Sequence, residues 1–77
     1  MKVIDFHGLF PTQAIGEVDR LIAKFAKTKK PAKVSLIVGH GIIRGIVCMY
    51  LQRVGIPYYY DGNNDGVIVI YFNEERE

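Results

Sequence analysis

A chain of 77 residues, of which 49% are hydrophobic and 23% charged, is long enough for one small globular domain and too short for a second one. This composition excludes global disorder, and a net charge of +2 permits an anionic partner without requiring one. No apolar run approaches the roughly 20 residues that a membrane span needs, and the one cysteine can form no internal disulfide, so we expect a cytoplasmic protein that does not enter a membrane.

The first half of the chain predicts a strand, a helix and a second strand. Residues 1–6 are rich in β-branched and aromatic side chains, which is typical of a strand. Pro11 suits the first turn of a helix, and apolar residues recur at helical spacing from there to Thr28. Residues 34–38 form a continuous apolar run, which predicts a parallel strand buried on both faces.

The second half predicts a helix followed by a hairpin. Apolar residues at helical spacing over 43–54 are followed by Gly55, a residue type that commonly ends a helix. Residues 58–60 and 67–72 have the composition of strands. The segment 61–66 between them is dense in Asp, Asn and Gly, so we interpret it as a hairpin loop rather than a calcium loop, whose twelfth-position Glu it lacks.

These elements follow the order βαβαββ. Alternating strands and helices favour parallel pairing through crossovers, whereas two strands joined by a short loop pair antiparallel. The predicted fold class is therefore α/β, a two-layer βαβαββ sandwich whose mixed sheet is mostly parallel and ends in a C-terminal antiparallel hairpin. We expect a single domain over residues 1–73, followed by an acidic tail at 74–77 that contains three glutamates.

Two similar motifs close the first two predicted strands. The sequence Asp-Phe-His-Gly at 5–8 closes the first, and a Gly-His-Gly sequence at 39–41 closes the second. Ligands of open α/β sheets bind beyond the carboxyl ends of parallel strands, so we expect Asp5, His7 and His40 to meet at one edge as candidate catalytic residues. The glycines allow close approach of the backbone, and the next helices begin nearby with unpaired N–H groups, an arrangement that suits a phosphodiester.

The candidate phosphate-binding residues at this edge are Gly8, Gly39, Gly41 and Arg44. Each candidate also has a purely structural interpretation. The glycines can be turn residues, the histidines can be capping residues, and Asp5 can accept backbone N–H groups at the strand end. Arg44 lies in the first turn of the second helix, where the helix dipole disfavours a cation. This placement points to an anionic ligand, although we favour the interpretation of Arg44 as a solvated surface residue.

Two other groups of residues resemble nucleic-acid contacts. Five lysines lie at the end of the first helix and the start of the second strand: Lys24, Lys27, Lys29, Lys30 and Lys33. This is the edge opposite the histidines, and cations are favoured at a helix C-terminus, so we interpret the lysines as a solvated helix end. Tyr58, Tyr59 and Tyr60 could stack on bases, but strand alternation sends Tyr59 to the face opposite its two neighbours.

These motifs together resemble the Smr (small MutS-related) domain family. Asp-Phe-His-Gly-Leu at 5–9, with Gln-Ala at 13–14, resembles the D-x-H-G-L…E-A opening of that family. The other matches are an apolar strand ending in H-G, the following L-R…V…Y-L helix and the closing G-G-x-G-V strand, at 38–41, 44–51 and 65–69. The resemblance covers residues 3–72.

The resemblance implies a two-layer βαβαββ sandwich that binds structured DNA or RNA, and several members act as metal-assisted endonucleases. Asp5, His7 and Gly8 match the first motif, and His40 and Gly41 match the second. The chain departs from the family in two places. About four residues of the glycine-rich loop after H-G are missing, and the usual Thr cap of the first helix is a phenylalanine, which has no capping oxygen.

Three hypotheses remain open. In the first, Mg²⁺ or Mn²⁺ bound at Asp5 assists a nuclease, or the imidazoles of His7 and His40 act as base and acid without a metal. In the second, the chain binds nucleic acid without cleaving it, because the glycine-rich loop is lost. In the third, it forms a homodimer that buries surplus apolar residues of the second helix: Ile42, Ile46 and Met49.

Overall fold

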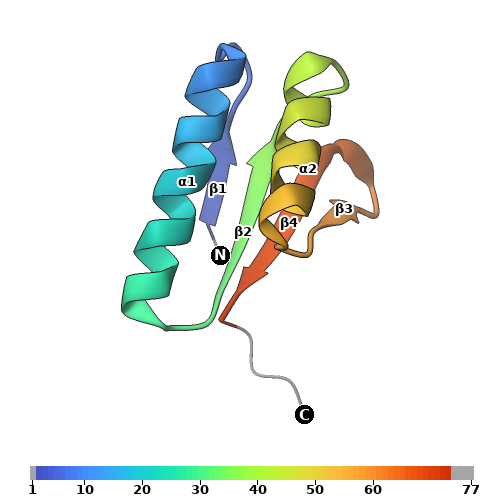
Figure 1. Cartoon of the computed structure of the whole chain (residues 1–77). Coiled ribbons are helices and arrows are strands. Elements are labelled where there is room, and N and C mark those ends of the chain that lie inside the picture. The colour runs from blue at the N-terminus through green and yellow to red at the C-terminus, as the bar shows by residue number, and fades with distance from the viewer. Residues whose placement is uncertain (1, 74–77) are drawn as a thin grey trace.

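The computed structural model describes residues 2–73, which form two helices and a four-stranded sheet (Figure 1). The elements are β1 (Lys2–Asp5), α1 (Pro11–Thr28), β2 (Ala32–Ile37), α2 (Ile42–Val54), β3 (Tyr59–Asp61) and β4 (Asn64–Phe72). The prediction of a mixed α/β chain with a mixed sheet is confirmed. Met1, which belongs to the predicted first strand, and the predicted acidic tail at 74–77 lie outside the described residues. Neither helix of the described part is long and apolar enough to cross a membrane.

The sheet has the strand order β1-β2-β4-β3. β1 pairs with β2 in parallel, whereas β4 lies between β2 and β3 and is antiparallel to both. The prediction of a mostly parallel sheet is therefore wrong, because only the β1–β2 pair is parallel. β1, β2 and β3 nevertheless run in the same direction. The physical reason is that the long apolar β4 is buried best in the centre, whereas the short β3, with two exposed tyrosines, is suited to the edge.

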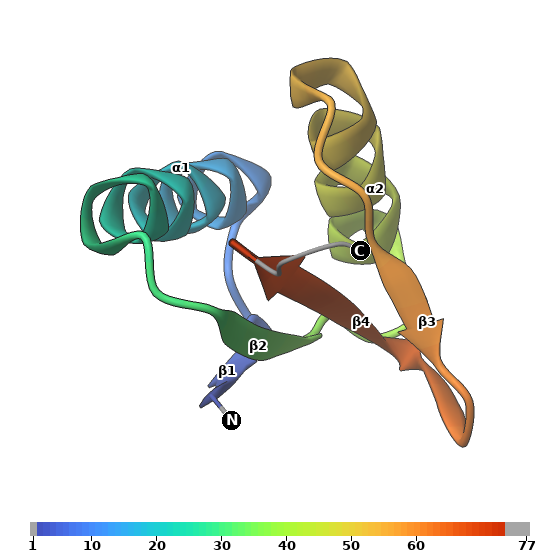
Figure 2. The same cartoon turned by 90° about the horizontal axis from the view of Figure 1, so that it is seen from below.

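Both helices cover the same face of the sheet, as the view along the strands shows (Figure 2). The core lies between this face and the helices, and its fully buried residues include Phe6, Val18, Val34, Leu36, Val47, Leu51, Ile68 and Ile70. The prediction that β2 is buried on both faces is confirmed at its centre, where Val34, Ser35 and Leu36 are all buried. In the described part of the chain, no helix packs on the face that carries Lys33, Ser35 and Ile37, which we call the open face.

The hairpin between β3 and β4 is tighter than its composition predicts. Asp61 pairs with Asn64, so the turn contains two residues and β4 begins well before the predicted start at 67. The Asp61 carboxylate accepts the Asn63 N–H at 2.8 Å, and Asn64 Oδ1 accepts the Gly66 N–H at 2.9 Å. These side-chain contacts hold the turn and place Asp65 inside the strand rather than in a loop.

The N-terminus of α1 is held by one of the helix's own side chains, and its C-terminus by side chains from the end of the described chain. Phe10 makes no side-chain cap, as its chemistry requires, but its N–H donates to Gln13 Oε1 at 2.8 Å. At the other end, the Asn73 amide donates to the carbonyl oxygen of Phe25 at 2.7 Å, and Phe25 stacks on Phe72 with ring centroids 4.7 Å apart. The end of β4 and the residue that follows it are thereby attached to the C-terminus of α1.

Replacement of Leu51 by alanine tests the burial of α2. Leu51 is fully buried against the sheet, so Leu51→Ala should lower the free energy of unfolding by about 2–5 kcal/mol. Met49 lies on the same helix and is mostly exposed, so Met49→Ala should change it by less than about 0.5 kcal/mol. Urea denaturation followed by circular dichroism measures both values, and equal losses would contradict this packing.

Candidate functional site

Asp5 and His7 lie at the carboxyl end of β1. Asp5 is opposite Ile37 in the parallel β1–β2 pair, so the segments that follow the two strands leave the same edge of the sheet, as predicted. The Asp5 carboxylate accepts the His7 N–H at 2.8 Å, and Gly8 has a φ of +87°, which glycine adopts without strain. Asp5 therefore organises its own turn, and the His7 side chain is exposed.

The loop from β2 to α2 is docked on β4. The N–H groups of Val38 and Gly39 both donate to the carbonyl oxygen of Gly66, at 2.9 and 3.0 Å. Gly39 has a φ of +73°, and Gly41 is the N-cap of α2, without a side chain that could satisfy the helix N–H groups. His40 is held between these two glycines at the tip of the loop.

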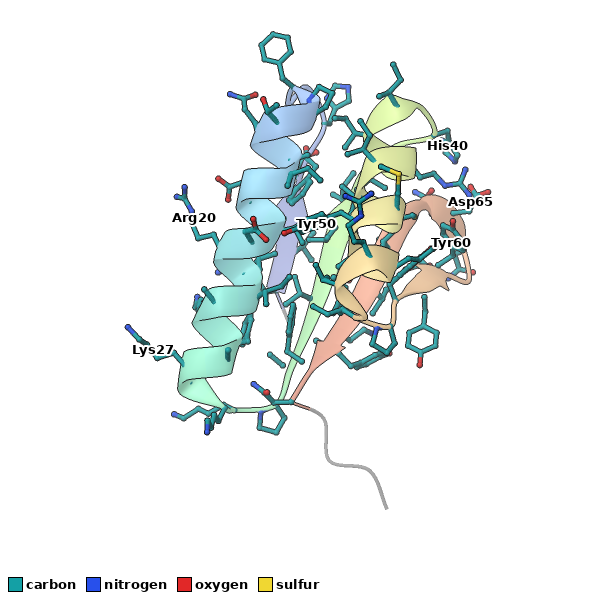
Figure 3. The ribbon with its side chains drawn as sticks, viewed as in Figure 1. Arg20, Lys27, His40, Tyr50, Tyr60 and Asp65 are labelled. Atoms are coloured by element: carbon teal, nitrogen blue, oxygen red, sulfur yellow. The ribbon has the colours of Figure 1, made fainter. Side chains whose placement is uncertain are left out.

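His40 pairs with Asp65, a residue of β4. The His40 Nε2 and Asp65 Oδ1 atoms are 2.6 Å apart, and both side chains are 63% exposed (Figure 3). The sequence interpretation missed Asp65, because it assigned 61–66 to a loop. The detectable signal was the Gly-Asn pair at 62–63, which is typical of a two-residue hairpin turn and would have extended the strand back to Asn64.

Arg44 completes a cluster around the same carboxylate. Its guanidinium lies over the Tyr60 ring, 4.8 Å from the centroid, and its Nη2 is 4.0 Å from Asp65 Oδ2. The Asp65 charge thus offsets the unfavourable placement of a cation at the N-terminus of α2. The Arg44 Nε is buried and has no hydrogen-bond partner among the described residues. We call His40, Arg44, Tyr60 and Asp65 the His40 cluster.

Hydrogen bonding sets the protonation of two members of the cluster. The bond from His40, reinforced by the charges of His40 and Arg44, lowers the pKa of Asp65 although partial burial opposes this. The Tyr60 hydroxyl lies 3.6 Å from the buried Cys48 Sγ, and this contact raises the pKa of Tyr60 although Arg44 opposes it. At neutral pH the cluster therefore presents a carboxylate and an un-ionised phenol.

The three tyrosines of the β3 region divide as strand alternation predicts. Tyr58 and Tyr60 contact each other edge to face on the α2 side, where the Tyr58 hydroxyl accepts a hydrogen bond from Gln52 at 2.7 Å. Tyr59 is on the open face and contacts Tyr71, also edge to face. Only Tyr60 of the three therefore belongs to the His40 cluster.

The structure separates the predicted site residues into two groups at one edge. Asp5, His7 and Gly8 form the turn after β1, whereas His40 and Arg44 belong to the His40 cluster. Within residues 2–73, no hydrogen bond or ion pair joins the two groups. The five predicted lysines lie in the last turns of α1, in the segment after it and near the start of β2, at the end of the molecule far from this edge (Figure 1).

The described residues do not form a ready metal centre. No group of three or more His, Cys, Asp or Glu side chains within 2–73 is arranged to hold a metal ion. Mg²⁺ prefers oxygen ligands, and Asp5 would supply one carboxylate, one oxygen of which already accepts the His7 N–H. The donors at this edge therefore do not fit a resident divalent ion, and we derive no chemical step through one.

Comparison of the chain with protein-family models, with curated proteins and with solved structures finds no match. Functional inference therefore depends on the geometry of the His40 cluster. Since Asp65 is ionised, we assign the proton of the His40 imidazole to Nε2, from which it donates to the carboxylate. With one proton on the ring at Nε2, Nδ1 is unprotonated and can accept a proton from a bound hydroxyl or water.

The paired geometry predicts an unusually acidic Asp65. The pKa of Asp65 is lowered in the folded chain. The stabilisation from its pairing with His40 is therefore fully present at pH values above the ordinary Asp pKa of 3.8, and it is lost as the pH falls through the lowered pKa of Asp65. We expect His40→Ala to return the Asp65 pKa toward the ordinary value, whereas His7→Ala should leave it unchanged. Titration of the carboxyl carbons by NMR measures both variants. An ordinary Asp65 pKa in the parent chain would show that the pair does not form in solution.

Gly66 must remain small for His40 to reach its position. A Cβ at Gly66 would lie 3.0 Å from His40 Cε1 and 3.4 Å from the Gly39 carbonyl carbon. Gly66→Ala should therefore displace the imidazole and raise the Asp65 pKa while the chain stays folded. A Cβ at Gly16 would point into open space, so Gly16→Ala should leave His40 unchanged and stabilise α1 by about 0.5–1 kcal/mol. NMR spectra of the imidazole protons distinguish the two.

Proposed function

We propose that this chain is an Smr-like nucleic-acid-binding domain, a two-layer sandwich that cleaves phosphodiester bonds in structured DNA or RNA. The observation that supports cleavage best is the 2.6 Å contact between His40 and the Asp65 carboxylate at the carboxyl end of β2. A carboxylate that accepts one imidazole N–H orients the ring and leaves the other nitrogen for proton transfer. The motif resemblance supplies the substrate class.

Each member of the His40 cluster has a distinct role in this proposal. His40 Nδ1 accepts the proton of the attacking hydroxyl or water, and Asp65 keeps the ring oriented. Arg44 meets the phosphate, because its guanidinium is near the same carboxylate as His40 and its planar cation suits phosphate oxygens. The Tyr60 ring holds the Arg44 guanidinium in place through a cation–π contact.

His7 is the candidate acid of the same reaction. It follows β1, the parallel neighbour of β2, so its exposed imidazole belongs to the same edge as His40. Protonated histidine can protonate the leaving oxygen while the other imidazole acts as base. The Gly8, Gly39 and Gly41 backbone would then border the bound phosphate. Assistance by Mg²⁺ or Mn²⁺ stays a separate prediction, in which substrate phosphates supply the ligands that the protein lacks.

Cleavage assays on branched DNA and on stem-loop RNA test this function. We expect His40→Ala to reduce the cleavage rate by about 100-fold or more, as loss of a general base does. Asp65→Asn should also reduce it, whereas the matched variant Asp61→Asn, in the same hairpin, should not. Reactions with Mg²⁺, Mn²⁺ or EDTA decide the metal requirement. Equal rates for the parent chain and His40→Ala would refute the assignment of His40.

Two non-catalytic functions have observations in their favour. The short loop after His40 favours simple binding, in which case Arg44→Glu should weaken binding more than Lys29→Glu, without any cleavage by the parent chain. Ile42 is 73% and Met49 is 56% exposed on α2, which favours a homodimer. Light scattering over a concentration series measures self-association, and a monomer at all concentrations would exclude the dimer.

A further inference from the structure

The open face of the sheet carries a pair of tyrosines that the His40 cluster does not use. Tyr59 of β3 is 48% exposed and Tyr71 of β4 is 41% exposed, although both belong to strands. Their rings meet edge to face with centroids 5.9 Å apart. No helix of the described chain covers this face (Figure 2), so both rings are accessible.

The paired strands of the sheet fix the positions of these two rings. Tyr59 is opposite Val69, and Tyr71 is opposite Lys33, so the two rings occupy neighbouring rows of the open face. Val69, which lies in β4 between its two neighbouring strands, is only 6% exposed. The Lys33 ammonium lies 5.9 Å from the centroid of the Tyr71 ring and adds a cation at the rim of the pair.

The charges on this part of the molecule favour an anionic occupant. Lys29 and Lys30 lie in the segment between α1 and β2, close in sequence to Lys33 on the open face. None of these lysines forms an ion pair with a residue in 2–73. Asp5, which is opposite Ile37, lies at the other end of the β1–β2 pair from Lys33. Three glutamates follow Asn73 in the sequence, outside the described residues.

We propose that the open face binds single-stranded nucleic acid, with unpaired bases stacked on Tyr59 and Tyr71 and a phosphate held by Lys33. Exposed aromatic rings on a sheet, bordered by cations, match the two components of a single strand, its bases and its charged backbone. A duplex keeps its base faces stacked within the helix and cannot use the rings. This surface is distinct from the His40 cluster, which lies at the edge of the sheet beyond β2, and it goes beyond the proposed cleavage function.

The surface also suggests how the two sites would cooperate. Structured nucleic acid contains single-stranded segments beside its helices, and the open face and the His40 cluster belong to the same small sheet. A nucleic-acid strand held on Tyr59 and Tyr71, with Lys33 at the end of the sheet away from His40, would reach the His40 cluster by extending along the sheet, without requiring the missing glycine-rich loop. Binding at the open face does not depend on cleavage, so each site can be tested without the other.

Fluorescence anisotropy with labelled ten-nucleotide dT and U strands, and a ten-base-pair duplex, tests the open face. We expect the full chain to bind the single strands more tightly than the duplex. Tyr59→Leu and Tyr71→Leu, which keep an apolar side chain but remove the ring, should each weaken binding by on the order of tenfold. Tyr59→Phe and Tyr71→Phe, which keep the ring, should bind like the parent. Thermal unfolding confirms that each variant is folded.

A pair of charge variants separates specific contact from general attraction. Lys33→Gln should weaken binding and reduce the slope of log affinity against log salt by about 0.7, the value for one single-strand phosphate contact. Arg20→Gln removes a cation from the outer side of α1 (Figure 3) and should leave both unchanged. NMR of the parent chain with dT strands should shift signals of Tyr59, Val69 and Tyr71, a result that does not depend on variant folding.

The outcomes distinguish this proposal from its alternatives. Equal affinity of the parent chain for the single strand and the duplex would overturn the proposal, as would undiminished binding by both leucine variants. It would also be overturned if the parent chain forms a dimer that the substitution Tyr71→Leu dissociates. If Arg44→Glu and His40→Ala change neither cleavage nor binding, but the leucine variants weaken binding of single strands, the open-face proposal is supported and the cleavage proposal fails. The reverse pattern supports the His40 cluster and refutes the open face.

Discussion

The docking of the β2–α2 loop on Gly66 is the contact on which the rest of this structure depends. One carbonyl oxygen of β4 accepts the N–H groups of Val38 and Gly39, which closes the loop against the strand. The absence of a side chain at Gly66 leaves room for the His40 ring, and the preceding residue of the strand, Asp65, reaches its Nε2. Backbone pairing and the small size of one glycine thus create the charged cluster.

This constraint follows from the central position of β4. A strand with three consecutive buried residues, Ile68 to Ile70, is most stable between two neighbours, and the tight hairpin brings it there from the edge strand β3. The same arrangement leaves one face of the sheet without helices. The helix side therefore contains the core, the sheet edge holds the His40 cluster, and the open face presents Tyr59 and Tyr71, so that the described residues offer two separate surfaces.

Local patterns were sufficient for much of the fold and for part of the site. Helical spacing and the stops at Thr28 and Gly55 predicted both helices, because burial of one helix face is a local periodicity. The pairing of the central strand was not predictable in this way, because antiparallel insertion depends on which strand gains most from burial. Asp65 was missed for a related reason, since turn-forming residues at 61–66 concealed a two-residue turn.

The sequence by itself determined the elements, the shared edge of Asp5, His7 and His40, and the opposite faces of neighbouring tyrosines, because strand alternation and parallel crossovers follow from backbone geometry. Only the tertiary structure decided which side chains from distant segments contact one another. It gave His40 a carboxylate from a strand 25 residues further on, supplied Arg44 with an anion and a ring, and left Tyr71 uncovered beside Lys33. Contacts between distant segments depend on the strand order of the sheet, which no local pattern contains.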